Sequence, residues 1–184
     1  MTKKMNKVLL CSENYIKSNS ALNDNIFGKF LAPAIRESQD INLQMYLGEC
    51  LYKRILGMVA DNSITASANE SYKTLLDDYI QPYLLYQVQA NIIPTINVKL
   101  GNIGSVLSND EHIATLSQAN IDLVQSDFQH KADFYGQRML NFILNHSSEF
   151  NLDECACKEL KAHLNSAAST TIWLGGLYGQ HDWE

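Results

Sequence analysis

The chain has 184 residues, 46% of them hydrophobic, which predicts a folded domain with a sizeable core and excludes wholesale disorder. Fourteen Lys and Arg residues against twenty Asp and Glu residues give a formal net charge of −6. Proteins that bind nucleic acid generally carry a basic excess, so this balance argues against that class.

The N-terminal third predicts an extended start followed by short helices. Val8–Ile16 is expected to form a strand or an extended segment. A helix is expected to begin near Leu31–Pro33, because proline suits the first helical turn. Gly48 is a natural terminator of that helix. The next helix is expected over Glu49–Ala60, where leucine and isoleucine recur at helical spacing.

The central part predicts a helix interrupted by prolines. Glu70–Tyr79 is amphipathic, and we expect Pro82 to kink or restart the helix and Pro94 to disrupt it again. Tyr79–Val98 contains no charged residue, yet its glutamines, asparagines and prolines are costly in hydrocarbon. We therefore expect a buried or interfacial helix and no contact with a membrane.

A glycine-rich loop, 98–108, separates this helix from a longer one. Two short strands, Ile96–Leu100 and Ile103–Leu107, are expected to flank a tight turn. Ser108 and Glu111 fit a capping box. The helical period that follows predicts a helix of about 30–35 residues, ending near Asn145–Ser148.

The C-terminal part predicts a last helix over Asp153–Asn165 and then an arm, Ser166–Glu184, that carries both tryptophans. The expected fold class is mainly α: a compact helical bundle with one long helix in its C-terminal half, a short β-hairpin or loop insertion, and an extended C-terminal arm. The expected domains are residues 1–165, with the insertion at 98–108, and the interaction arm 166–184.

No pattern in the chain predicts a catalytic or metal site. Cys155 and Cys157 point apart on a helix, and with His163 they supply only three ligands where structural zinc takes four. Asp77 and Asp78 are adjacent on a helix and do not face each other. We therefore expect no catalytic residue, no metal and no cofactor, and four cysteines that are free thiols.

A row of tyrosines occurs at helical spacing in the central helix: Tyr72, Tyr79, Tyr83 and Tyr86. Such a row is typical of a core whose hydroxyl groups reach the rim. A binding surface is the alternative interpretation.

Five stretches, taken in order, carry a resemblance: APAIRESQDINLQMYLGECLYKRI, LLDDYIQPYLLYQ, NIGSVLSNDEH, ADFYGQRMLNFILNHSSEF and TTIWLGG. Together they resemble the head–tail connector (adaptor, or portal-proximal ring) proteins of tailed bacteriophages. The similarity is to the branch found in phages and prophages of Bacteroidetes, the crAss-like phages included. It covers roughly Ile16 to Gly176.

The resemblance implies a structural virion protein without enzymatic activity. It implies a homo-oligomeric ring, typically dodecameric, at the head–tail interface, made in the bacterial cytoplasm. The portal protein and downstream ring or tail proteins would be its partners. Genome DNA would pass through the ring without sequence-specific binding, which a negative net charge suits because fixed cations grip phosphates.

The contact residues that we expect in such a ring fall into two groups. The arm residues would contact the portal or an adjacent subunit: Ile172, Trp173, Leu174, Tyr178 and Trp183. The loop residues would contact a neighbouring subunit or line the channel: Lys99, Asn102 and Ile103.

Two other functions stay open on the sequence. A helical regulatory or scaffolding module would bind a protein partner without ring symmetry. A small enzyme would need polar groups that converge in a pocket, and no sequence motif supports one.

Overall fold

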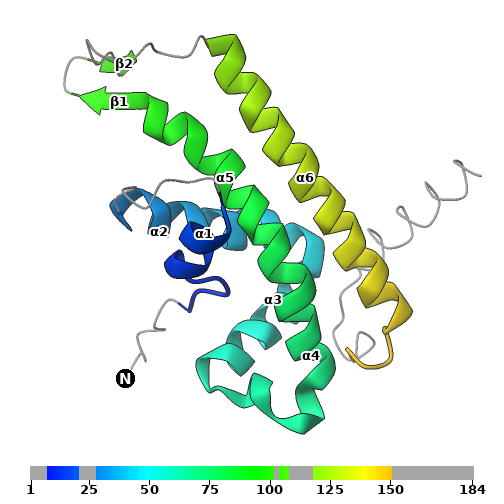
Figure 1. The fold of residues 1–184 in the computed structure, drawn as a ribbon. Coiled ribbons are helices and arrows are strands. Elements are labelled where there is room, and N and C mark those ends of the chain that lie inside the picture. Colours follow the sequence, from blue (N-terminus) through cyan, green and yellow to red (C-terminus); the bar gives the residue numbers. More distant parts are fainter. Residues whose placement is uncertain (1–7, 21–27, 102–103, 108–117, 151–184) are drawn as a thin grey trace, which may run out of the picture.

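The computed structural model describes residues 8–20, 28–101, 104–107 and 118–150. Within these ranges the protein is mainly α-helical, with bundle-like packing and one long helix in the C-terminal half (Figure 1), as predicted. The predicted capping box at Ser108, the predicted helix Asp153–Asn165 and the C-terminal arm lie outside the described residues.

The first continuous helical segment joins α2 (Gly28–Glu37), a π-helical turn (Ser38–Leu43) and α3 (Gln44–Ala60). The π-helical turn was not predicted. Gly48 interrupts α3 with φ 69° and ψ 159°, a conformation that favours glycine, so the predicted break at this residue is confirmed.

The second continuous segment joins α4 (Glu70–Thr74), another π-helical turn (Leu75–Ile80) and α5 (Gln81–Asn97). Helix α5 begins at Gln81, directly before Pro82, so the helical segment continues through this proline after the π-helical turn. Pro94 does not disrupt it, and that prediction is wrong. This proline lies in the last turn of α5, so its missing N–H removes one hydrogen bond close to the end of the helix.

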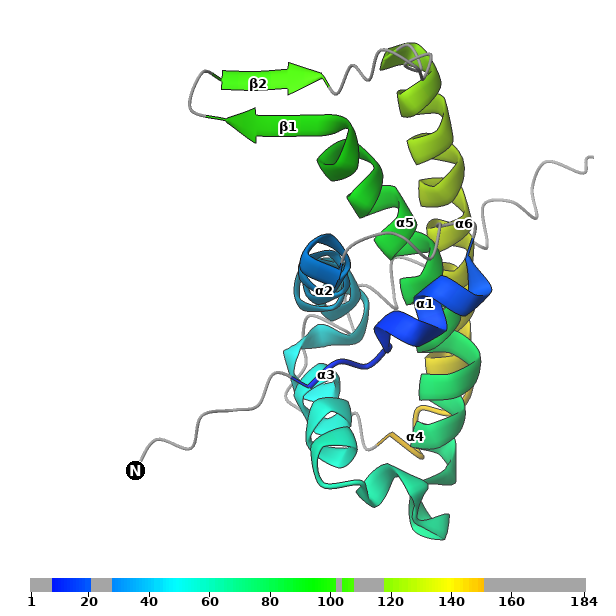
Figure 2. The ribbon, with the colours of Figure 1, turned by 60° about the vertical axis from the view of Figure 1, so that its left-hand side comes forward.

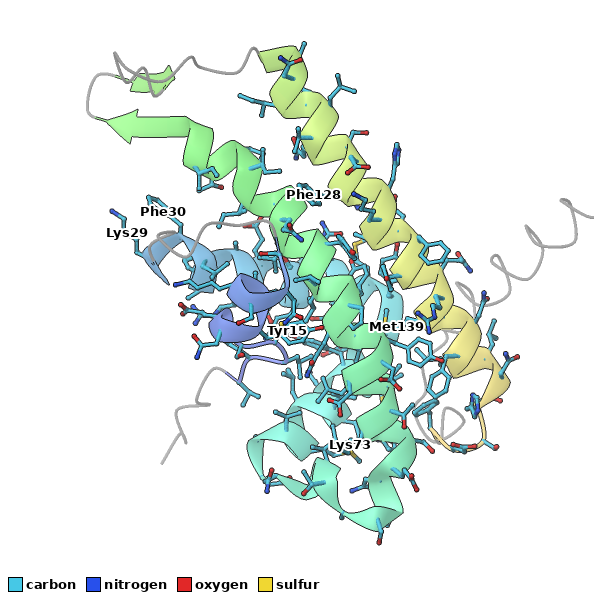
Figure 3. All side chains as sticks on the ribbon, in the orientation of Figure 1. Tyr15, Lys29, Phe30, Lys73, Phe128 and Met139 are labelled. Carbon is cyan, nitrogen blue, oxygen red and sulfur yellow. The ribbon has the colours of Figure 1, made fainter. Side chains whose placement is uncertain are left out.

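Helix α6 (Gln118–Asn145) runs antiparallel to α5 and also packs on the π-helical turn before it (Figure 1), and it ends where the sequence predicts. Met139, fully buried, points from α6 into the body (Figure 3). Tyr72 and Tyr83 are also buried, whereas Tyr79 and Tyr86 pack half-buried against the same core. The tyrosine row therefore belongs to the core, as its spacing predicts.

The core lies between the two segments and α6. The body of the molecule, as we use the term, comprises α1–α4, both π-helical turns and the parts of α5 and α6 that pack against them. Its largest fully buried side chains are Tyr83, Phe150, Ile16, Leu31, Ile35, Leu43, Leu47, Leu51, Ile55, Leu75, Ile80 and Leu84.

The predicted hairpin follows α5 directly. Strands β1 (Val98–Gly101) and β2 (Gly104–Leu107) pair antiparallel, with Val98 opposite Leu107 and Gly101 opposite Gly104. Figure 2 shows the hairpin extending sideways from the upper end of α5, away from α6. Apart from the pairing of its strands, its main contact is with the end of α5.

Two boundaries in the N-terminal part differ from the predictions. Residues Glu13–Asn19 form helix α1, where a strand or extended segment was expected, because Ser12 caps the helix by accepting a hydrogen bond from the Tyr15 N–H. Helix α2 begins at Gly28, so Pro33 lies inside it. The missing N–H of this proline removes one intrahelical hydrogen bond near the start of the helix.

The cysteines also differ from expectation. Cys11 is a free and buried thiol, whereas Cys50 on α3 is disulfide-bonded. The prediction of free thiols is therefore wrong for Cys50.

Candidate interaction surfaces

The structure places few of the predicted contact residues. Lys99 lies in strand β1. Asn102 and Ile103 lie in the turn, outside the described residues. The arm residues are also outside the described part: Ile172, Trp173, Leu174, Tyr178 and Trp183. Other exposed surfaces involve residues that were not predicted as contacts, apart from Tyr79 and Tyr86, for which a binding surface was the alternative interpretation.

One end of the molecule, which we call the distal surface, combines the hairpin with three exposed apolar side chains. Ile96 ends α5 with 38% of its surface exposed, and Leu123 and Val124 in the first turns of α6 are 68% and 43% exposed. The antiparallel helices place these residues at the same end (Figure 1). Exposed apolar side chains near a hairpin that pairs with no further described strand are typical of a contact surface.

Val124 lies at the edge of the packed face of α6. Ile121, three residues before it, is buried at 6% exposure, whereas Val124 is 43% exposed. The packed face of α6 therefore continues as far as Ile121, and Val124 lies beside it partly uncovered. Leu123 lies outside the apolar face of α6, so the sequence alone already indicates an exposed apolar side chain at this position.

A second exposed apolar pair lies on the other helical segment. Ile41 in the π-helical turn and Met45 in α3 are four residues apart and 56% and 65% exposed. Between them in sequence, the Asn42 side chain accepts a hydrogen bond from Asn91 of α5. The pair therefore lies on a segment whose position is fixed by a polar contact.

Aromatic side chains from α5 and α6 form a strip that we call the aromatic seam. Tyr86 stacks on Tyr135 with ring centroids 5.2 Å apart, and Tyr79 stacks on Phe142 at 4.3 Å. The Arg138 guanidinium lies 5.2 Å from the centre of the Tyr79 ring. All four rings are half-buried, and Arg138 is exposed.

Phe134 extends the aromatic seam into solvent. Its ring meets Tyr135 edge-on at 5.5 Å, yet 65% of its surface is exposed. Arg138 forms no ion pair with any acidic group of the described residues. Half-buried tyrosines beside an unpaired arginine match the composition of contact sites that dominate binding energy.

The lower end of the seam is fixed by Arg54. Its Nη1 donates hydrogen bonds to the Phe150 carbonyl oxygen (2.8 Å) and to the Tyr72 hydroxyl (3.0 Å). The Phe150 ring is fully buried and lies 5.9 Å from Phe142. The described chain therefore ends in a firmly held position beside the seam.

On another side of α5, a chain of amides connects three helical segments. Gln87 exchanges hydrogen bonds with Gln129 of α6 and donates to Asn91, which in turn donates to Ser38 of the π-helical turn. Asp133 accepts from Gln129. Amides neither ionise nor act as nucleophiles at neutral pH, so this network fixes the alignment of the helices and offers no catalytic chemistry.

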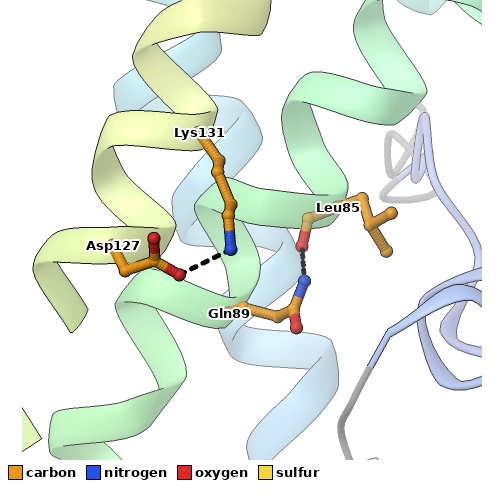
Figure 4. A network of polar contacts seen from close by, with 4 residues as sticks. All are labelled: Leu85, Gln89, Asp127 and Lys131. Carbon is orange, nitrogen blue, oxygen red and sulfur yellow. Dashed lines mark hydrogen bonds and ion pairs between the residues drawn. The ribbon is translucent and has the colours of Figure 1, made fainter. Parts of the chain in front are cut away.

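Other polar groups in this region are satisfied within their own helices. Gln89, which is 2% exposed, donates to the Leu85 carbonyl oxygen at 2.9 Å, and Lys131 pairs with Asp127 at 2.5 Å (Figure 4). Burial raises the pKa of the Cys11 thiol to about 12, which makes it a poor nucleophile. Within the described ranges, no three or more His, Cys, Asp or Glu residues are grouped to hold a metal.

These features define a class of protein: a helical scaffold with a projecting hairpin and exposed apolar and aromatic surfaces. The chain belongs to DUF6712, a family of unknown function whose model matches residues 43–159. The match spans α3 to α6 and continues past Phe150. No curated protein and no solved structure matches the chain.

The described part of the chain contains no helix that is both long and apolar enough to cross a bilayer. The uncharged run of α5 is instead covered by α2 and α6.

Proposed function

We propose that this protein is a head–tail connector of a tailed bacteriophage, a structural subunit that forms a ring on the portal vertex. The assignment to phages comes from the resemblance of the five sequence stretches. The observation that supports an assembly role is the distal surface, where Ile96, Leu123 and Val124 are exposed and the hairpin pairs with no further strand of the described residues.

A ring needs two different faces on each subunit, one for each neighbour. The described residues offer two exposed apolar sites on different segments: the distal surface, and the pair Ile41 and Met45. In the proposed ring, the hairpin with Lys99, Asn102 and Ile103 contacts the neighbouring subunit or lines the channel.

The arm supplies the other contacts. Ile172, Trp173 and Leu174 would add an apolar segment to the portal or to an adjacent subunit, because strand addition and aromatic anchors are common in such contacts. The ring would extend the DNA conduit and give downstream tail proteins a docking face. The net charge of −6 suits a conduit that does not retain DNA.

The proposed role involves no catalysis, metal or cofactor, and places the protein in the virion. A helical module that binds a single partner is the second candidate, because the same exposed surfaces would serve it. The two candidates differ in symmetry: a connector assembles into a ring on the portal, whereas a module forms a complex of low stoichiometry.

The test is negative-stain electron microscopy of this protein co-expressed with the portal protein of the same genome. A second ring stacked on the portal is expected. Leu123→Ser and Trp173→Ala should each reduce ring attachment without loss of helical circular dichroism, whereas Lys53→Gln on the body should not. Bare portal rings beside a monomeric protein would contradict the connector and favour the single-partner module.

A further inference from the structure

We infer that in the isolated subunit the aromatic seam is the docking site for the C-terminal arm of the same chain, Ser166–Glu184. The inference concerns the subunit before it meets any partner, so it does not depend on the connector function. It rests on the chemistry of the seam, the place where the described chain ends, and the composition of the arm.

The seam has an exposed side that its own helices leave uncovered. Phe134 is 65% exposed although it touches Tyr135, and the stacked pairs Tyr86–Tyr135 and Tyr79–Phe142 are only half-buried. Tyrosine offers a large contact area with few rotatable bonds, and both tyrosine and arginine are enriched among the residues that dominate binding energy, which makes the strip a favourable surface for an apolar segment.

The arm matches the seam in charge and in side-chain type. It contains Trp173, Tyr178 and Trp183, it has the acids Asp182 and Glu184, and it contains no Lys or Arg. The seam presents Arg138, which forms no ion pair with the described acids. An arginine whose guanidinium group lies over an aromatic ring can still donate hydrogen bonds to a carboxylate through its N–H groups.

The geometry of the chain allows the arm to reach the seam of its own subunit. Arg54 holds the Phe150 carbonyl beside Phe142, at the lower end of the seam. The chain between Phe150 and Trp173 spans up to roughly 75 Å when extended. Helix α6 is about 42 Å long at 1.5 Å per residue, so every part of the seam is within reach.

Attachment to the same chain also favours docking within the subunit over docking between subunits. A tethered segment has an effective concentration in the millimolar range, far above the micromolar concentration of separate chains in a dilute sample. We therefore assign the seam to the arm of the same chain and not to the arm of a second copy.

The intact protein provides its own reporter, because both of its tryptophans lie in the arm. The experiment records tryptophan emission and acrylamide quenching of the full-length chain at several protein concentrations. Docking predicts blue-shifted emission, quenching several-fold weaker than for free tryptophan, and no dependence on concentration. Phe134→Ser and Arg138→Gln should each shift the emission to the red and increase quenching.

Lys131→Gln is the matched control, since Lys131 lies on the same helix and pairs with Asp127. It should leave both signals unchanged. Phe134 is largely exposed, so Phe134→Ser should keep the fold, which far-UV circular dichroism verifies. Solvent-exposed emission in the wild type would overturn the inference, and so would shielded emission that neither seam variant alters. Tryptophan shielding that appears only at high protein concentration would assign the seam to the arm of a second copy, and this result would also overturn the inference.

Discussion

Val88 of α5 and Val124 of α6 both occupy positions that the helical period directs inward, yet Val88 is fully buried and Val124 is 43% exposed. The difference follows from what lies beside each residue. Val88 belongs to α5, which packs against both α2 and α6, whereas Val124 lies at the edge of the packed face of α6, beside the buried Ile121. One helix pair therefore combines a body that completes its own packing with a distal surface that does not.

This contrast shows how far the isolated chain can satisfy its own packing. A hairpin of two short strands is marginally stable in water unless other elements pack against it. The distal surface combines such a hairpin with exposed Ile96, Leu123 and Val124. A partner that packs against the distal surface would therefore account for the difference in burial between the two regions.

The largest effect should come from truncating the core of the body. Leu84→Ala removes a fully buried side chain of α5 and should lower the free energy of unfolding by about 2–5 kcal/mol. Leu123→Ala on the distal surface should change it by less than about 0.5 kcal/mol. Urea unfolding of both variants measures the contrast, and equal losses would show that the distal surface is packed like the body.

The next effect concerns Arg54, which holds the end of the described chain. Arg54→Met leaves the Phe150 carbonyl and the Tyr72 hydroxyl without this donor and should cost about 1–3 kcal/mol of stability. Among the described residues, the neighbouring Lys53 pairs with Glu49 at the surface, so Lys53→Met should cost less than about 1 kcal/mol. Thermal unfolding compares the two, and a similar loss in both would contradict the role given to Arg54.

The burial of Cys11 predicts a pH dependence of the body. Its pKa rises from 9.0 to about 12 in the folded chain, so the unfolded chain releases this proton first as the pH increases. The contribution of Cys11 to the free energy of unfolding is therefore fully present below about pH 9. It decreases between pH 9 and 12 by at most about 1.4 kcal/mol per pH unit.

Cys11→Val keeps an apolar side chain and removes the ionisation. Urea unfolding between pH 8 and 11 should therefore show a smaller decline for this variant than for the wild type. Burial also raises the pKa of Tyr83 above 10.0, so part of the decline should remain. Identical declines in both proteins would show that Cys11 is accessible.

The smallest effects come from two glycines and should differ in sign. A Cβ atom at Gly136 would lie 2.7 Å from the Tyr46 ring, whereas nothing lies within 4 Å of one at Gly57. Gly57→Ala should stabilise α3 by about 0.5–1 kcal/mol. Gly136→Ala should lose about 1 kcal/mol, because overpacking exceeds the gain in helix propensity. Thermal unfolding in parallel gives both signs, and stabilisation by Gly136→Ala would show that Tyr46 moves aside.

Local sequence signals predicted most of the helical fold. Gly48, the end of α6 near Asn145 and the turn after α5 were recognised because each depends on the residues nearby. The close approach of Gly136 to the Tyr46 ring was not predicted, because the two residues are distant in sequence and no local pattern reveals such a contact.

The deviations have the same origin. Both π-helical turns and the passage of α5 through Pro94 depend on packing between helices, which overrides local preference. The aromatic seam could be anticipated in part, since Tyr79 and Tyr86 were known to share a face. Their partners Phe142 and Tyr135 could not, because the alignment of α5 with α6 is set by three-dimensional packing.

Hydrogen exchange followed by mass spectrometry, on the free subunit and on the subunit assembled with the portal protein, tests the contrast between body and distal surface most directly. In the free subunit the amides of Leu84–Ile92 should be protected, and those of β1, β2 and the first turns of α6 should exchange quickly. Assembly should slow exchange at the distal elements and leave the body unchanged. Distal amides that are already protected in the free subunit, or that stay fast after assembly, would contradict the account.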